Sequence, residues 1–295
     1  MLSRTSRHGT TLVELLVVLV LLAMVGGAIM RIAVGQQRFL DAVTRVMEVH
    51  RTVQEGADIP RQELRAIGAA SGGIYDMTAD RIDFRSLIGT SVLCDADSSR
   101  TTVSIPGRLS WSGVTSWIVA PRERDTVLVF DATTDSAPPD WHVHTLATAP
   151  APGGRCPVAS GLARTSAEEG NALTFQIAPP LELTVEAGAS LRFVRRARYQ
   201  LYRAGDGQWY LGFLDCAPAR SVPCSVIQPV SGPFAPAGVR FAFRDSTGAI
   251  TADPTRVARV DVLSRTASST SLRAMGFALG IYYDSTLASI ALRNR

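Results

Sequence analysis

The sequence predicts an α+β protein in which a long N-terminal helix packs on a predominantly antiparallel β-sheet head. Two observations lead to this fold class. An apolar run of about 20 residues opens the chain and continues into an amphipathic segment, and short runs of alternating or β-branched residues recur beyond residue 73. We therefore divide the chain into residues 1–9, a basic leader; 10–34, a membrane-spanning half-helix; 35–72, an amphipathic half-helix; and 73–295, a β-rich head.

The apolar run has the length of a membrane span. Residues 15–30 contain no charged or strongly polar side chain, and a helix rising about 1.5 Å per residue over some 20 residues approaches the ~30 Å hydrocarbon core. Arg4 and Arg7 precede the run and no acid does, so the short N-terminus is expected in the cytoplasm and the rest outside. Glu14 is the one acid at the head of this run, and inserting a charged side chain into a membrane costs roughly 2.5 to 3.5 kcal/mol. It therefore requires a compensating partner.

Gly9 is followed by Thr-Thr-Leu-Val-Glu-Leu-Leu and an unbroken apolar helix. This stretch resembles the class III signal of type IV pilins and type II secretion pseudopilins. The resemblance implies cleavage by the prepilin peptidase after Gly9 and N-methylation of Thr10, where the family usually has Phe or Met. It also places Glu14 at the fifth mature position. There the carboxylate would pair with the N-terminal amine of a neighbouring subunit and select the axial register.

The end of the chain resembles the terminal region of larger minor pilins. Residues 239–245 with Gly248, then 256–265 and a closing Ile-Ala-Leu-Arg-Asn at 290–294, follow a pattern of strand, turn and strand. PilW-type minor pilins and the J-type pseudopilins of type II secretion share this pattern. Together with the size of the chain, it implies a minor rather than a major subunit.

Two other interpretations of the N-terminus stay open. Ala33-Val34-Gly35 could be the cleavage site of an ordinary secretory signal peptide, which would leave Gln36 as the new N-terminus. Against this, the apolar run exceeds the usual 7 to 15 residues, and Arg31 lies just before that site. A plain signal anchor with an incidental Glu14 is the other alternative. Either one would make the protein an exported β-rich binding domain or enzyme.

The segment after the span is expected to continue as an amphipathic helix. Apolar residues recur at three- and four-residue spacings, which predicts a buried face made of Phe39, Leu40, Val43, Val46, Met47 and Val53. Gly56 and Pro60 are expected to kink or interrupt the helix, since proline lacks the amide donor. A further turn or two is predicted over residues 62–70, ended by Ser71-Gly72-Gly73.

The head is predicted to be antiparallel sheet. The dipeptide Asp206-Gly207 between two aromatic runs is a strong hairpin signal. Strands are expected at residues 81–84, 101–105, 126–130, 141–146, 173–177, 191–202, 209–214, 239–243 and 257–263.

All four cysteines lie beyond the span, which suits disulfides in an oxidising compartment. Four cysteines allow three connectivities. The prolines just inside residues 216 and 224 suggest a pinched loop, so we favour Cys216 with Cys224 and, by elimination, Cys94 with Cys156.

Catalysis finds little support in the sequence. There is no Gly-x-Ser-x-Gly elbow, no phosphate-binding loop and no lysine in the chain. His142 and His144 should share one face of a strand, but no Asp or Cys nearby in the sequence converges with them. We expect no enzyme activity, no cofactor and no metal.

A basic segment carries arginines at 192, 195, 196, 198 and 203 with interleaved aromatic residues. Alternation spreads these arginines over both faces of a strand, so nucleic-acid binding is not expected.

The resemblance implies a minor pilin or pseudopilin at the tip or initiation complex of a type IV pilus or a type II secretion pseudopilus. Its expected partners are the prepilin peptidase, other major and minor pilins or pseudopilins, the inner-membrane assembly platform and membrane lipid. It would be a single-pass inner-membrane protein with a periplasmic head before assembly and a filament subunit afterwards. A tip adhesin would share this assembly chemistry.

Overall fold

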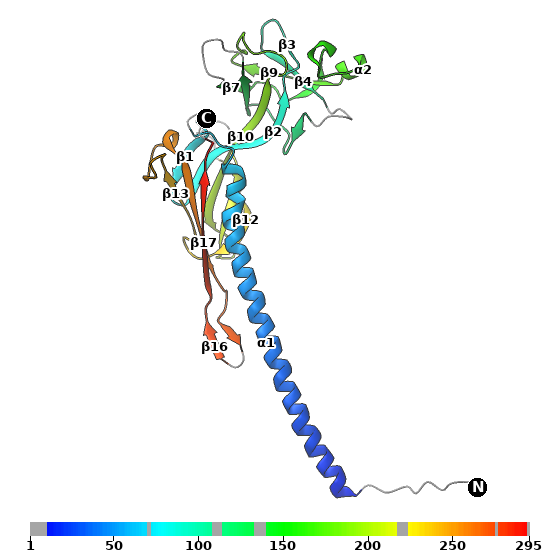
Figure 1. The fold of residues 1–295 in the computed structure, drawn as a ribbon, viewed down its shortest axis with the longest axis vertical. Helices are drawn as coiled ribbons and strands as arrows, with labels where there is room; N and C mark the ends of the chain where they lie inside the picture. Colours follow the sequence, from blue (N-terminus) through cyan, green and yellow to red (C-terminus); the bar gives the residue numbers. More distant parts are fainter. Residues whose placement is uncertain are drawn as a thin grey trace, which may run out of the picture. The chain divides into compact units, whose positions relative to one another are not determined.

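The computed structural model describes residues 11–69, 72–107, 114–132, 140–216, 224–274 and 277–293, with side chains described outside 273–279. The helical elements are α1 (Leu12–Leu64), η1 (Val158–Ser160), α2 (Ser166–Glu169) and η2 (Pro254–Arg256). The strands are β1 (Ile74–Thr78), β2 (Arg81–Val92), β3 (Asp95–Ala96), β4 (Thr102–Pro106), β5 (Ser116–Trp117), β6 (Thr126–Asp131), β7 (Asp140–Leu146), β8 (Ala151–Gly154), β9 (Ala172–Ala178), β10 (Ser190–Arg203), β11 (Trp209–Asp215), β12 (Gln228–Phe234), β13 (Val239–Arg244), β14 (Arg259–Ala267), β15 (Leu272–Ala274), β16 (Phe277–Gly280) and β17 (Tyr283–Ala291). The α+β class is therefore confirmed (Figure 1).

Helix α1 runs for 53 residues without interruption and includes Pro60. The predicted break near Gly56 and Pro60 is wrong, and so is the further helix after it, because α1 ends at Leu64. Gly56 serves close packing: a Cβ on it would lie 2.7 Å from the Phe234 ring and 2.6 Å from the Ser264 hydroxyl. Pro60 is itself buried. Tertiary packing at the end of α1 thus offsets the ~3 kcal/mol that an interior proline costs.

The buried stripe of α1 differs from the predicted one. Val53 is buried as expected, and Val43 and Val46 are half-buried. Phe39, Leu40 and Met47, however, are 47%, 62% and 66% exposed. The positions that are buried follow helical spacing on the adjoining face, at Ala42, Val49, Val53, Ala57, Pro60 and Leu64. The stripe begins at a small residue, Ala42. A prediction based on large apolar residues therefore places the buried face wrongly.

The chain forms two compact units. The first holds residues up to 51 together with 266–284, and the second holds 52–265 and 285–295. In the first unit, β15 and β16 pair antiparallel. Arg45 of α1 donates a hydrogen bond to the hydroxyl of Thr270, and Nδ1 of His50 lies 2.8 Å from a carboxylate oxygen of Asp284.

The sheets of the second unit are organised by the pair β2 and β10. These long strands are antiparallel from Val92 opposite Ser190 to Arg81 opposite Gln200. The main sheet has the order β1-β2-β10-β6-β7-β9-β4-β3, and β11, joined to β10 by the predicted hairpin, carries β12 at its side. A second sheet has the order β13-β14-β17.

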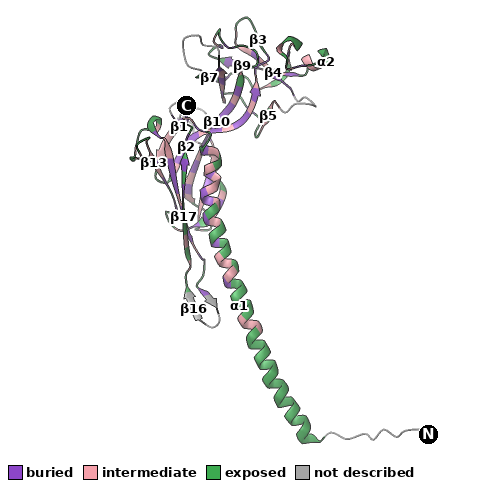
Figure 2. Ribbon diagram, in the orientation of Figure 1, coloured by how far each residue is buried: buried purple, intermediate pink, exposed green. Residues whose placement is uncertain are grey.

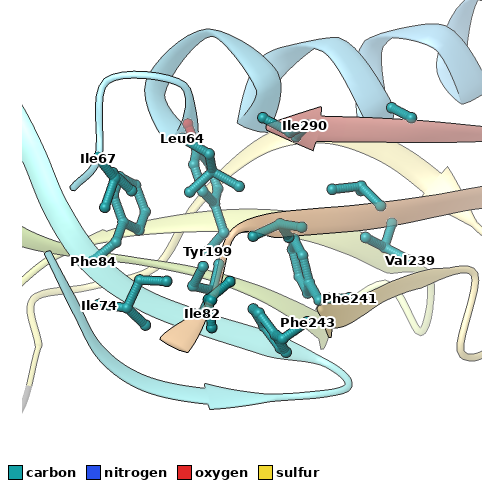
Figure 3. Close-up of a cluster of buried hydrophobic side chains, with 14 of the residues drawn as sticks. Leu64, Ile67, Ile74, Ile82, Phe84, Tyr199, Val239, Phe241, Phe243 and Ile290 are labelled. Carbon is teal, nitrogen blue, oxygen red and sulfur yellow. The ribbon is translucent and has the colours of Figure 1, made fainter. Parts of the chain in front are cut away.

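A first core contains the end of α1. Ala57 and Leu64 pack there with β2, β10, β11 and the β13-β14-β17 sheet. Figure 3 shows Leu64 and Ile67 directed into the same cluster as Phe84 and Tyr199. The rings of Phe84 and Tyr199 stack with centroids 5.3 Å apart. This core fixes the last turns of α1 on the sheet.

A second core is built on the other halves of β2 and β10. Ile88 of β2 and Leu191 and Phe193 of β10 pack with β4, β6, β7 and β9. The Phe193 ring contacts Trp117 and Phe175 edge-on, at centroid distances of 4.7 and 5.5 Å. Residues 93–189 supply the rest of this core, between two positions that face each other across the β2–β10 ladder.

Candidate functional site

The candidate assembly surface lies on the first half of α1. Gly9 and Thr10, the predicted processing residues, lie outside the described residues. Glu14 lies in the first turn of α1, and its backbone N–H donates to the side-chain oxygen of Thr11 at 3.3 Å. Thr11 is therefore the N-cap, and Glu14 occupies the third helical position, which matches the Thr-x-x-Glu sequence pattern of a capping box. This pattern is visible in the sequence, although Thr11 was not among the predicted site residues.

Among the described residues of its own unit, none covers the apolar span of α1. Large apolar residues from Leu12 to Ile32 are 49% to 78% exposed (Figure 2). Within the described part of the chain, α1 is the one helix long and apolar enough to cross a membrane. It could thus be covered by lipid, by other helices or by both.

Exposed apolar side chains continue on α1 beyond the span. Phe39, Leu40 and Met47 extend the exposed surface by about five turns past Met30. They lie outside the stripe that α1 buries in its own chain. We call residues 12–32 together with Phe39, Leu40 and Met47 the helix surface.

Two disulfides cross-link the second unit in the favoured pairing. Cys94 is bonded to Cys156, 62 residues away, and we call this bond the long-loop disulfide. Cys216 is bonded to Cys224, 8 residues away, and this is the short-loop disulfide. Disulfides persist in oxidising compartments, so they indicate that this unit lies outside the cytoplasm.

The basic segment lies on β10, where aspartates neutralise most of it. Arg195 makes a bidentate pair with Asp125, with Nε to Oδ1 at 2.8 Å and Nη2 to Oδ2 at 2.6 Å. A second carboxylate, Asp215, lies 3.3 Å from Nη1 of Arg195. The Arg195 side chain is 6% exposed and that of Asp125 is fully buried. This pair is therefore an internal element of the sheet.

Asp83 neutralises the next two arginines. It is fully buried on β2 and accepts hydrogen bonds from Arg196 and from Nε and Nη2 of Arg198. Burial alone would raise the pKa of Asp83, but the hydrogen bonds and charges of Arg198 and Arg196 outweigh it and hold that pKa below its usual value. The carboxylate is ionised at neutral pH.

Arg192 and Arg203 differ from these three arginines. Nε of Arg203 donates to the carbonyl of Gly207 in the hairpin. The guanidinium carbon of Arg192 lies 4.3 Å above the centroid of the Trp141 ring. Because three of the five arginines are bound to aspartate inside the protein, β10 does not present the continuous basic stripe that nucleic-acid binding needs.

His142 and His144 share one face of β7, as alternation predicts. His144 is fully buried, with Nδ1 2.9 Å from the carbonyl of Pro179 and Nε2 3.5 Å from Glu182. His142 lies 3.4 Å from Glu182 and 3.7 Å from Asp131. The sequence shows no Asp or Cys close to these two histidines, but the fold brings Asp131 and Glu182 to them. Even so, no three His, Cys, Asp or Glu residues in the described ranges form a group that could hold a metal ion.

Glu63, in the last turn of α1, borders a cavity of about 490 Å³ in the second unit. Its carboxylate accepts hydrogen bonds from the hydroxyls of Ser86 at 3.0 Å and Tyr199 at 3.2 Å. Burial raises the pKa of Glu63, against the lowering effect of these hydrogen bonds. No local pattern in the sequence marks this residue, since it falls within an ordinary run of polar helix residues.

Comparisons with known proteins identify no relative of this chain. No protein-family model matches the chain, and neither a curated protein nor a solved structure shows significant similarity to it.

Proposed function

We propose that this protein is a minor pilin or pseudopilin, a subunit that the helix surface inserts into a type IV pilus or a type II secretion pseudopilus. The observation that carries the proposal is the uninterrupted helix α1. It has an exposed apolar half headed by a single acid, and its last turns pack into the core of a disulfide-linked β-rich unit. A subunit held first in the inner membrane and then in a helical bundle needs such a helix, because lipid covers the same surface before assembly that neighbouring helices cover afterwards.

The helix surface is larger than lipid contact alone requires. Phe39, Leu40 and Met47 lie beyond the span, and each would expose apolar area to water in an isolated subunit. Burying such side chains against a neighbour is worth about 1.5 to 3 kcal/mol each. Their exposure therefore favours packing between helices over a simple anchor, which ends with its span.

Glu14 can serve two roles that one substitution separates. As a capping-box residue it serves its own helix, and Gln can replace it in that role. As a charge partner it answers the N-terminal amine of another subunit, and Gln cannot. Glu14→Gln should then leave export and processing intact but strongly reduce incorporation into filaments. Thr11→Ala, which removes the cap and keeps the charge, is the matched control and should assemble far better.

The assay measures the variant chain in sheared filaments against the chain remaining in membranes, in cells that carry the whole assembly system. Normal incorporation of Glu14→Gln would refute the pairing role. A loss of incorporation for Thr11→Ala but not for Glu14→Gln would show that the cap, and not the charge, is what matters.

The N-terminus of the exported chain separates this proposal from ordinary export. Mass spectrometry of the membrane or filament form should find Thr10 as the first residue, carrying an N-methyl group, and Gly9→Ala should abolish this processing. A chain that begins at Gln36 would identify an ordinary signal peptide. The protein would then be an exported binding domain or enzyme.

A further inference from the structure

A second cavity in the β-rich unit is strongly basic. It has a volume of about 250 Å³, and the side chains of Arg85, Arg192 and Arg293 line it together with Thr90. The remaining described lining residues are apolar or glycine, and none is Asp or Glu. Three cationic groups around one small hollow repel one another, so the arrangement has a cost unless an anion occupies it.

Aromatic rings help to position two of these guanidinium groups. Arg192 stacks on Trp141 at 4.3 Å, and Arg85 lies 5.8 Å from the Tyr75 centroid while its Nε donates to the Tyr75 hydroxyl at 3.2 Å. Arg192 sits opposite Thr90 of β2 in the ladder, so the hydroxyl and the guanidinium share one face of the sheet. Arg85, Thr90 and Arg192 are therefore held on strands, and Arg293 lies just after the end of β17.

Arg192 also contrasts with its neighbours on β10. Arg195, Arg196 and Arg198 each contact a buried aspartate, whereas no carboxylate in the described ranges lies within ion-pair distance of Arg192. Burial lowers the pKa of Arg192, and the positive charge of Arg293 lowers it further. An anion in the cavity would oppose both effects, because its negative charge favours the charged form of Arg192.

We propose that this cavity binds a phosphate group, either as free inorganic phosphate or at the end of a small phosphate monoester. The forked donors of arginine match phosphate oxygens in bidentate geometry. A phosphate monoester carries about 1.5 to 2 negative charges at neutral pH, which suits three guanidiniums better than a single carboxylate does. The volume is below that of ordinary ligand pockets, about 300 to 1,000 Å³, and so suits a small anion. This site is independent of the helix surface and of the assembly role.

The test uses the full chain in a non-ionic detergent, titrated calorimetrically with inorganic phosphate, glycerol phosphate or acetate at about 150 mM salt to screen weak surface effects. Arg192→Gln should weaken phosphate binding at least about tenfold, because it removes a fixed bidentate donor. Arg293 is exposed, so Arg293→Gln should weaken phosphate binding less than Arg192→Gln does. This second variant replaces Arg192→Gln in the test if Arg192→Gln does not fold. Arg240→Gln on β13 is the matched control, since it changes the charge equally at an exposed site that does not line the cavity.

Saturable binding of phosphate or glycerol phosphate that Arg192→Gln or Arg293→Gln weakens and Arg240→Gln does not would support the proposal. Tighter binding of one of the two ligands would identify the free anion or the ester as the form preferred. The absence of saturation up to about 10 mM phosphate, equal weakening by Arg240→Gln, or binding of acetate as tight as that of phosphate would overturn it.

Discussion

Asp83 should be among the most important residues for the stability of the β-rich unit. Asp83→Asn removes the negative charge and leaves the guanidiniums of Arg196 and Arg198 around a neutral amide, with side chains only 6% and 20% exposed. Breaking a buried ion pair from one side costs about 3 to 5 kcal/mol. At roughly 2 to 4 °C per kcal/mol for a unit of this size, the melting temperature should fall by about 6 to 20 °C.

The assay is urea denaturation of the disulfide-intact chain in non-ionic detergent, followed by tryptophan fluorescence. Glu186→Gln is the matched control, because it makes the same change of charge at an exposed position and should alter the free energy of unfolding by less than about 0.5 kcal/mol. A loss below about 1 kcal/mol for Asp83→Asn would refute the reasoning, because the charge would then be dispensable.

The pH dependence offers an independent check on Asp83. Its pKa is lowered on folding, so its ionisation stabilises the folded state above the unfolded pKa of about 3.9. This contribution is lost as the pH falls through the folded pKa. The gap in stability between the wild type and Asp83→Asn should therefore be constant from about pH 5 to 7 and narrow below about pH 4. A gap that widens on acidification would contradict the assignment.

Three further perturbations follow from the structure. Gly56→Ala should destabilise the protein by about 1 to 3 kcal/mol, because its Cβ would collide with the Phe234 ring, whereas Gly35→Ala, with open space around it, should not; equal unfolding midpoints in urea would contradict this. The Glu63→Gln variant should be as stable as the wild type near pH 4 and more stable than the wild type at pH 7, because the raised pKa of Glu63 means that ionisation of its carboxyl disfavours folding. A lower stability of the variant at pH 7 would mean that the carboxylate charge is needed. Replacing both cysteines of the long-loop disulfide by serine should lower the free energy of unfolding by about 4 kcal/mol, and the same change at the short-loop disulfide should lower it by about 2.5 kcal/mol, because a longer closed loop restricts the unfolded chain more. The reverse order in denaturant titrations would contradict this reasoning.

Much of the fold follows from local patterns in the sequence. The strands β4, β6, β7, β9, β10, β11, β13 and β14 and the Asp-Gly hairpin between β10 and β11 were predicted. β2 was predicted only over residues 81–84, whereas it extends to Val92. The strands that were missed have weak local patterns. β12 contains Pro229 and Pro233, which an edge strand tolerates because one side of it needs no donors. β17 alternates small and polar residues around Ala288 and Ile290, so its period is visible only from the burial.

The course of α1 and the charged interior depend on tertiary contacts that the sequence does not display. Pro60 predicts a break, yet the packing of Leu64 and its neighbours carries the helix past it. Asp83 is more than 100 residues away from the arginines that it binds, so β10 looks like a basic segment when it is considered alone. Glu14 was found because an acid in an apolar run is conspicuous locally.

Residues 93–189 form a separable module, because the chain leaves β2 and enters β10 at two positions that face each other across the β2–β10 ladder. Val92 faces Ser190 across the ladder, so a two-residue turn could close the gap that removal of the module would leave. Of the retained strands, Ile88, Leu191 and Phe193 would lose their apolar packing partners, and the buried Arg195 would lose the carboxylate of Asp125. Evolution can therefore exchange or enlarge this module while α1 and its supporting sheet stay unchanged, and a protein engineer could graft a foreign domain at the same two positions, provided that it supplies an apolar face and an acid for Arg195.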